Sequence, residues 1–136
     1  MNGLVLDASI ALGWMVDAPV PRVSLRALQF LQSGTIGVVP DLWYYEFSNA
    51  LTVAERRGRV SAQVVSSHVS DLEHLAAFLE VSPTTPSALL AAARQSGLMA
   101  YDAAYFELAM RRNLPLATLD ARMRTAARRA GIELLR

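Results

Sequence analysis

Short apolar runs alternate along the chain with longer segments in which apolar residues recur every three or four positions. The apolar runs predict five β-strands, at residues 4–6, 36–39, 79–81, 114–118 and 132–135. The periodic segments predict helices at residues 21–33, 41–57, 61–77, 86–96, 101–112 and 120–130. Strands that alternate with helices in this way predict an α/β fold, with a parallel sheet covered by helices on both faces.

Residues that end or begin helices stand at several of these boundaries. Gly58, Gly97 and Gly131 each follow a helical segment, where glycine readily adopts the left-handed conformation of a helix stop. Ser61 stands at the start of the helix after Gly58 and is expected to cap it. The periodicity and the boundary residues therefore agree on where the helices lie.

The length and composition of the chain narrow its class. Its 136 residues, 53% hydrophobic and 18% charged, suit one ordered domain over residues 1–136. No apolar run approaches the roughly 18 residues of a membrane span. The N-terminal segment also lacks the basic lead of a signal peptide. We therefore expect a cytoplasmic protein that does not engage a membrane.

Two residue types are missing from the chain, and this excludes several kinds of site. Without cysteine there is no disulfide, zinc thiolate or cysteine nucleophile. All 13 basic residues are arginine, so there is no lysine for a P-loop or a Schiff base. His68 and His74 lie in a helical segment without an evident serine or metal partner. Carboxylates, hydroxyls and arginines remain as the groups that can carry chemistry.

Four carboxylates stand out by their positions. Asp7 ends the first strand, and Asp120 follows the fourth. Glu46 is embedded in an apolar helical stretch, and Asp102 opens a helix. Each has a structural alternative. Asp7 and Asp120 could cap the helices that follow them. Asp102 could interact with a helix dipole, and Glu46 could face solvent.

Taken together, the positions of the four acids predict a metal site. The carboxyl ends of parallel strands meet at one edge of a sheet, which is where ligands bind in open α/β sheets. Four carboxylates gathered there would repel one another, and a divalent cation would relieve this. Oxygen ligands without histidine or cysteine suit Mg²⁺ or Mn²⁺. Ser9, Asn49 and Thr118 lie close to these acids in the sequence and could hydrogen-bond a carboxylate or a water molecule of the site, or, for Ser9 and Thr118, only the turn backbone.

Four sequence motifs carry a resemblance to a known family. LVLDAS, PDLWYYEFSNAL, AYDAAYFELA and LPLATLD contain the four acids in order, and they resemble the acidic motifs of PIN-domain ribonucleases. The size of the chain and its AARRAGIELL segment are similar to VapC-type toxins of bacterial toxin–antitoxin modules. The likeness extends from Val5 to Leu135. Met99 departs from the family, which often has a serine or threonine shortly before its YDA sequence, and this puts a helix cap in doubt.

The resemblance implies a fold, an activity and partners. The fold is a PIN-like three-layer α/β/α arrangement of about five parallel strands in the order 3-2-1-4-5. The activity is that of a Mg²⁺- or Mn²⁺-dependent endoribonuclease, the toxin of a type II toxin–antitoxin system. Asp7 and Asp102 are then expected to be direct metal ligands, and Glu46 and Asp120 to complete the catalytic site directly or through water. The expected partners are a VapB-like antitoxin, an RNA substrate and a second copy of the chain.

Other classes of protein fit the sequence less well. A phospho-acceptor receiver domain needs a lysine and an early acidic pair, and the chain has neither. A phosphatase with an aspartyl nucleophile needs an acid two residues after the first aspartate, where this chain has Ser9. A non-catalytic PIN-like interaction module, in which the acids serve as caps, remains an alternative.

The charge of the chain is concentrated near its C-terminus. Residues 111–136 contain seven arginines and two acids, a net charge of +5. Arg122 lies two residues past Asp120, and Arg129 follows seven residues later on the same helix face. We expect Arg122 and Arg129 to guide RNA phosphates toward the acids, and the row of Arg124 and Arg128 to be solvated or structural.

An aromatic stretch accompanies the second acid. Trp43, Tyr44 and Phe47 lie on the helix that carries Glu46, and Trp14 follows the first acid. Core packing accounts for most of these side chains. Part of the aromatic surface is nevertheless expected to contact an amphipathic antitoxin segment that sends a basic side chain toward the acids.

Overall fold

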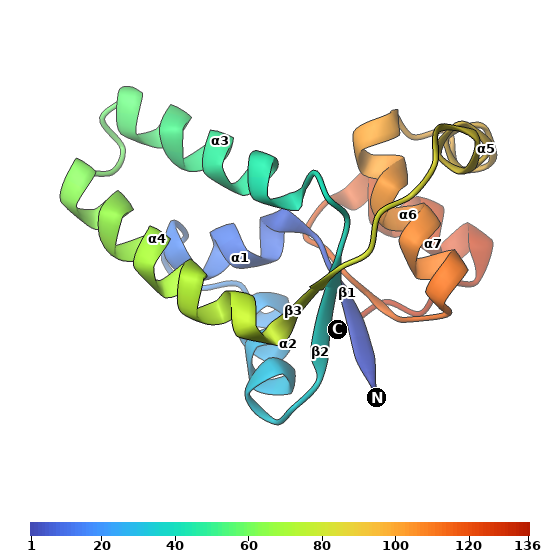
Figure 1. The fold of residues 1–136 in the computed structure, drawn as a ribbon, viewed down its shortest axis with the longest axis horizontal. Coiled ribbons are helices and arrows are strands. Elements are labelled where there is room, and N and C mark those ends of the chain that lie inside the picture. The colour runs from blue at the N-terminus through green and yellow to red at the C-terminus, as the bar shows by residue number, and fades with distance from the viewer.

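Four parallel strands form the sheet in a computed structural model that describes all 136 residues (Figure 1). They are β1 (Gly3–Leu6), β2 (Ile36–Val39), β3 (Leu79–Val81) and β4 (Leu116–Ala117). The strand order is β3-β2-β1-β4, and each neighbouring pair is parallel. This confirms the α/β class and the order predicted for the first four strands.

The fifth predicted strand is reduced to one bridge. Leu134 pairs with Leu116 in parallel, at the outer edge of β4, where a fifth strand was expected. Its backbone bonds are Leu116 N to Glu133 O at 2.8 Å and Leu135 N to Leu116 O at 2.9 Å. β4 is also shorter than predicted. Pro115, just before it, has no N–H with which to extend the ladder.

Seven α-helices accompany the sheet. They are α1 (Ala8–Met15), α2 (Arg22–Gln32), α3 (Trp43–Arg56), α4 (Ala62–Leu75), α5 (Pro86–Ser96), α6 (Ala100–Arg112) and α7 (Ala121–Ala130), with a 3₁₀ turn η1 (Ala76–Phe78) after α4. The six predicted helices are confirmed. The additional helix, α1, is apolar on most of its sides, so it gives no clear helical period in the sequence.

The predicted boundary residues act as expected. Gly97 and Gly131 end α5 and α7 in the left-handed conformation, with φ of 73° and 74°. Gly58 has φ of 70° just after the last residue of α3 and its cap. The Ser61 hydroxyl caps α4 by accepting a hydrogen bond from Val64 N at 3.2 Å. These helix ends are therefore set by local backbone chemistry.

The connections between strands place the helices in two groups, one on each face of the sheet. Helices α1 to α4 connect β1 to β2 and β2 to β3, whereas α5 and α6 connect β3 to β4, in the opposite direction across the sheet. Because such crossovers are right-handed, the two groups cover opposite faces. Figure 1 shows α3 and α4 extending together to one side of the strands and α5, α6 and α7 on the other side.

The largest buried side chains come from α3 and α6. Trp43, Phe47, Tyr105 and Phe106 are at most 1% exposed and belong to one hydrophobic cluster of 27 residues. This cluster fixes the first turns of α3 and α6, which carry two of the candidate acids. None of the helices is both long enough and apolar enough to span a bilayer.

Candidate active site

Asp7 is held at the carboxyl end of β1. Its backbone N–H donates to Ala117 O at 3.0 Å, which joins the end of β1 to the end of β4. The side chain is 6% exposed, and its Oδ2 accepts hydrogen bonds from Ser9 Oγ and Thr118 Oγ1, both at 2.7 Å. The carboxylate makes no capping bond to α1. The capping interpretation of Asp7 is therefore not the one the structure adopts.

The two hydroxyls that contact Asp7 also bind the backbone between β4 and α7. Ser9 Oγ accepts from Leu119 N at 3.1 Å, and Thr118 Oγ1 accepts from Asp120 N at 3.0 Å. Both interpretations of Ser9 and Thr118 from the sequence thus hold at once. Both hydroxyls donate to Oδ2, so the other oxygen of Asp7 receives neither of these two bonds.

Glu46 lies in the first turn of α3 and is half-buried. Its Oε1 accepts a hydrogen bond from the hydroxyl of Tyr105, a fully buried residue of α6. Burial raises the pKa of Tyr105, and the nearby carboxylates raise it further, so the phenol stays protonated and acts as the donor. Glu46 therefore faces solvent only in part, because its carboxylate also binds the buried Tyr105.

Asp102 and Asp120 occupy helix starts. Asp102 lies in the first turn of α6, where the helix dipole favours a negative charge. Asp120 is the N-cap of α7, and its Oδ1 accepts from Met123 N at 2.8 Å. The capping alternative for Asp120 is confirmed. This bond occupies Oδ1 and leaves the second carboxylate oxygen of Asp120 without a hydrogen bond.

The pKa values of three acids connect all four into one neighbourhood. Burial is the largest cause that raises the pKa of Asp7, Glu46 and Asp102. Repulsion from Asp102 also raises the pKa of Asp7, and repulsion from both raises that of Glu46. Asp120 raises the pKa of Asp102, whereas Arg122 lowers it. The folded chain thus brings the acids close enough for negative charge to oppose the ionisation of Asp7, Glu46 and Asp102.

The chemistry of these donors fits a hard divalent cation. As the side chains stand, no three acids or histidines converge closely enough to hold a metal ion. Mg²⁺, however, keeps several of its waters and uses only one or two carboxylates. Asp7, a buried carboxylate whose Oδ1 receives neither hydroxyl bond, and Asp102, close enough to raise its pKa, are the residues best suited to this role. A bound cation would also relieve the repulsion within the cluster.

Some predicted residues are placed outside this hydrogen-bonded group. Asn49 is exposed on α3 and makes no side-chain hydrogen bond. Arg122 and Arg129 line one cavity of about 390 Å³, beside Gly97 at the end of α5. Arg122 is near enough to Asp102 to lower its pKa. The predicted common face of the two arginines is therefore present, next to one of the acids.

Tyr105 was missed in the sequence, and Arg124 was predicted only to be solvated or structural. Tyr105 stands three residues after Asp102, a spacing that places both on one face of a helix and could have indicated it. Arg124 is half-buried and its Nη1 donates to Thr118 O at 3.1 Å, which braces the loop that carries Asp120. No local pattern in the sequence distinguishes Arg124 from the other arginines of α7.

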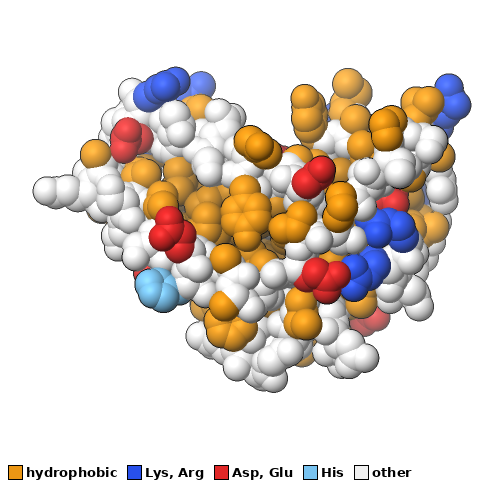
Figure 2. Space-filling view, viewed as in Figure 1, with side chains coloured by type: hydrophobic (Ala, Val, Ile, Leu, Met, Phe, Trp, Pro, Cys, Tyr) orange, Lys and Arg blue, Asp and Glu red, His pale blue; other side chains and the backbone are white.

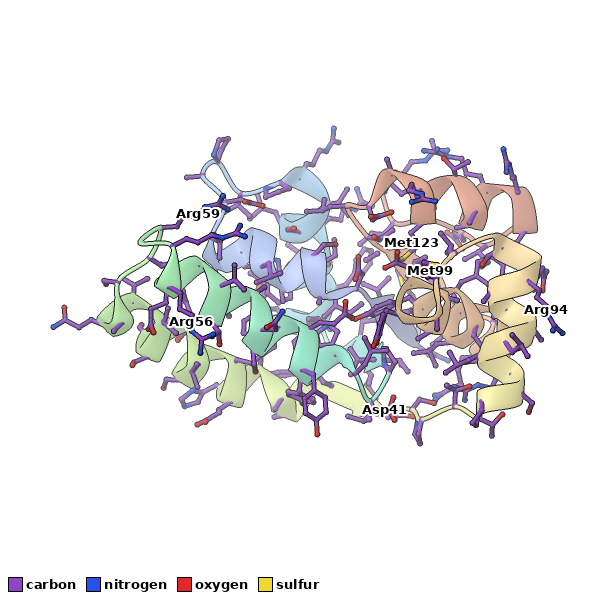
Figure 3. The ribbon with its side chains drawn as sticks, turned by 90° about the horizontal axis from the view of Figure 1, so that it is seen from above. Asp41, Arg56, Arg59, Arg94, Met99 and Met123 are labelled. Atoms are coloured by element: carbon purple, nitrogen blue, oxygen red, sulfur yellow. The ribbon has the colours of Figure 1, made fainter.

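The side chains exposed near the acids differ from the aromatic residues that the sequence suggested for a partner. Trp43 and Phe47 are completely buried, as core packing predicts for most of these side chains, so these two are not available to a partner. The exposed residues beside the acids are Tyr45, Met99 and Tyr101, at 80%, 76% and 72% exposure. Met99 begins α6 without a side-chain cap, and Figure 3 shows it between α3 and α5. In Figure 2, hydrophobic side chains fill the hollow between the two groups of helices.

Comparison with known proteins supplies a family. The sequence model of the PIN domain matches residues 4–129, and no curated protein matches the chain. Among solved structures, PAE2754 from Pyrobaculum aerophilum is 26% identical, with a TM-score of 0.68 over 93% of this chain and 79% of that one. VapC20 from Mycobacterium tuberculosis, a Sarcin-Ricin loop cleaving toxin, is 16% identical, with a TM-score of 0.58 over 90% of this chain and 94% of that one.

Proposed function

The chain belongs to the PIN-domain family, and from this premise we propose that it is a metal-dependent endoribonuclease, the toxin of a type II toxin–antitoxin system. The observation that supports this activity is the group of four acids at the carboxyl edge of the sheet, where burial and neighbouring carboxylates raise the pKa of Asp7, Glu46 and Asp102. Burying and crowding carboxylates destabilises a fold unless a cation binds them. The proposal treats residues 1–136 as one nuclease domain.

The proposed cofactor is Mg²⁺ or Mn²⁺. Asp7 and Asp102 would hold the ion, and Glu46 and Asp120 would complete the site directly or through water. When bound, such an ion activates water and stabilises the charge that develops on a phosphodiester under attack. The donors are all oxygens, which is the ligand type that these cations prefer.

The remaining residues would position the acids and the substrate. Ser9 and Thr118 fix the Asp7 carboxylate through its Oδ2. Tyr105 fixes Glu46, and a carboxylate held in this way can orient the attacking water. Arg122 and Arg129 are proposed to bind RNA phosphates next to Asp102, because arginine grips phosphate through two parallel hydrogen bonds.

RNA cleavage with purified protein tests the activity. We expect wild-type protein to cleave RNA in Mg²⁺ or Mn²⁺ and to stop when the metal is chelated. Asp102→Asn keeps the shape of the side chain but loses its charge, and we expect at least a hundredfold loss of cleavage. Asp71→Asn, on the exposed face of α4, is the matched control and should cleave as the wild type does. Equal cleavage by Asp102→Asn and wild-type protein would refute the proposed site.

The proposed partner is a VapB-like antitoxin. Tyr45, Met99 and Tyr101 are exposed side chains close in sequence to Glu46 or Asp102, and we propose that they contact the antitoxin. A partner helix that covers these side chains could place a basic side chain near the acids and block the site. A purified complex with the antitoxin should therefore cleave RNA much more slowly than the free chain. Equal rates would argue against this arrangement. A homodimer of the chain is part of the same proposal.

A non-catalytic interaction module is the second candidate. Two observations favour it: Asp120 serves as a helix cap, and no three ligands converge. Stability in the presence of metal separates the two candidates. A nuclease site should gain stability from Mn²⁺ because the ion binds only the folded chain, whereas an interaction module should not.

A further inference from the structure

A second basic surface is built by residues far apart in the sequence. A cavity of about 750 Å³ is lined by residues of α2, of α7 and of the C-terminal segment that pairs with β4. Four arginines line it: Arg26, Arg124, Arg128 and Arg136. Glu133 is the one acid in the lining. The cavity therefore has a strong excess of positive charge.

None of these arginines has a carboxylate partner. The ion pairs of the structure join Arg111 with Glu107 and Arg112 with Glu80, and none of these four residues lines the cavity. The uncompensated guanidinium groups are therefore available to an anion.

Two of the guanidinium groups are held in place by contacts that leave their charge free. Arg124 donates to Thr118 O at 3.1 Å, so one side of its guanidinium is fixed to the backbone. Arg26 lies with its Cζ 5.7 Å from the centre of the Phe30 ring, in a cation–π contact. Such prepositioning lowers the entropy that is lost when an anion binds.

We propose that this cavity is an exosite that binds phosphate groups of an RNA strand. Guanidinium groups bind phosphate oxygens through two hydrogen bonds, and four arginines line one cavity here. The volume lies within the range of small-ligand pockets, so a nucleotide unit can enter it. Phe30, Ile132 and Leu134 add an apolar wall to the charged one, which suits a nucleotide with its flat base.

The exosite extends along the strands. Arg124, one of its lining residues, donates to Thr118 O close to Asp120, and another part of the lining lies at the end of the strands away from the acids. Met1 and Pro115 line it and precede β1 and β4, whereas Asp7 and Asp120 follow the ends of those strands. A strand of four residues, the length of β1, spans about 13 Å. An RNA strand bound at both places would extend along α7. The sequence alone predicted a solvated or structural role for the Arg124 and Arg128 row, and the cavity changes that interpretation for Arg128.

Binding of an oligoribonucleotide to an inactive protein tests the exosite, which rests on the proposal that RNA is the ligand of this chain. Asp102→Asn serves as the background, and affinity is measured by fluorescence anisotropy across a salt series. We expect Arg26→Ala and Arg128→Ala each to weaken binding about three- to tenfold and to lower the salt slope by about 0.7 for each lost contact. Arg124 is left intact because it also braces the loop at Thr118.

Arg94→Ala is the matched control. Arg94 is exposed on α5, and Figure 3 shows it pointing away from the rest of the chain. The substitution Arg94→Ala removes the same charge outside the cavity and should leave the salt slope of RNA binding unchanged. Both cavity arginines are exposed as well, so their removal should not unfold the chain, and circular dichroism verifies this.

The outcomes separate the exosite from the nuclease. Salt slopes of Arg26→Ala and Arg128→Ala equal to that of Arg94→Ala would overturn the exosite, even if wild-type protein cleaves RNA. Reduced slopes in a chain that never cleaves RNA would support the exosite and refute the nuclease. Two other results would overturn RNA as the occupant. One is that the protein binds a free mononucleotide or polyglutamate more tightly than the oligoribonucleotide, in a way that depends on these arginines. The other is that it does not bind RNA at all.

Discussion

The substitution Asp7→Asn isolates the charge of the most buried acid of the site. Asparagine has the same shape, and its side-chain oxygen can accept both hydrogen bonds that Ser9 and Thr118 now donate to Oδ2. The change therefore removes the negative charge while it preserves the contacts that join β1 to the loop before α7. Any difference in metal response reports on the charge itself.

The expected magnitude follows from mass action. If Mn²⁺ binds the folded chain only, a concentration ten times its Kd stabilises wild-type protein by about 1.4 kcal/mol. For a chain of this length, that free energy raises Tm by about 4–7 °C. Asp7→Asn should lose most of this increase, because a buried amide is a much poorer ligand for a hard cation than a carboxylate. Asp71→Asn on α4 should keep the full increase of Tm.

The metal-free protein should show the opposite effect of the same charge. Because burial raises the pKa of Asp7 above its usual 3.8, the folded chain binds more protons than the unfolded chain between the two pKa values. The free energy of unfolding therefore falls as the pH rises through that interval. Asp7→Asn should flatten this decline and be more stable than wild-type protein at pH 7 without metal.

Differential scanning calorimetry with and without Mn²⁺, at several pH values, measures both effects. Calorimetric titration gives the stoichiometry and Kd directly. Two results would refute the reasoning. One is a wild-type chain that takes up no Mn²⁺ at millimolar concentration. The other is the same increase of Tm in Asp7→Asn and in wild-type protein.

Three further predictions test the contacts around the acids. Tyr105→Phe removes the hydrogen bond to Glu46 and should lower metal affinity or cleavage about 10- to 100-fold with little change in Tm, as titration and cleavage rates would show. Thr118→Val removes the donor to Asp7 and the acceptor for Asp120 N, and thermal unfolding should show a loss of about 1–3 kcal/mol. Arg122→Ala should lower the salt slope of RNA binding by about 0.7–1, whereas Arg94→Ala should not, and equal slopes would remove Arg122 from the RNA path.

The sequence predicts the fold well because the fold is encoded by local patterns. Apolar runs and helical periods locate four strands and six helices, and glycines mark the ends of three of the helices. The failures have physical causes. Helix α1 is apolar on most sides and so has no amphipathic period. The segment 132–135 has the composition of a strand but makes only one bridge, beside a two-residue β4.

The candidate site is predicted in part for the same reason. Asp7 and Asp120 follow strands, so the position of a strand end is enough to place them at the same edge of the sheet. Tyr105 cannot be found in this way, because its contact with Glu46 joins residues 59 positions apart. The burial of Trp43 and Phe47 likewise depends on how α3 packs against the rest of the core.

The structural and the chemical interpretations of these residues support each other. Asp120 caps α7 through one oxygen, and the cap holds the second oxygen at the edge where Asp102 lies. Thr118 binds the backbone of that loop and the Asp7 carboxylate with a single hydroxyl. The contacts that stabilise the turn are thus the contacts that hold the acids close together. A variant that relaxed the turn would separate the charges and gain apo stability from weaker repulsion, but it would lose the preorganised carboxylates that a cation requires.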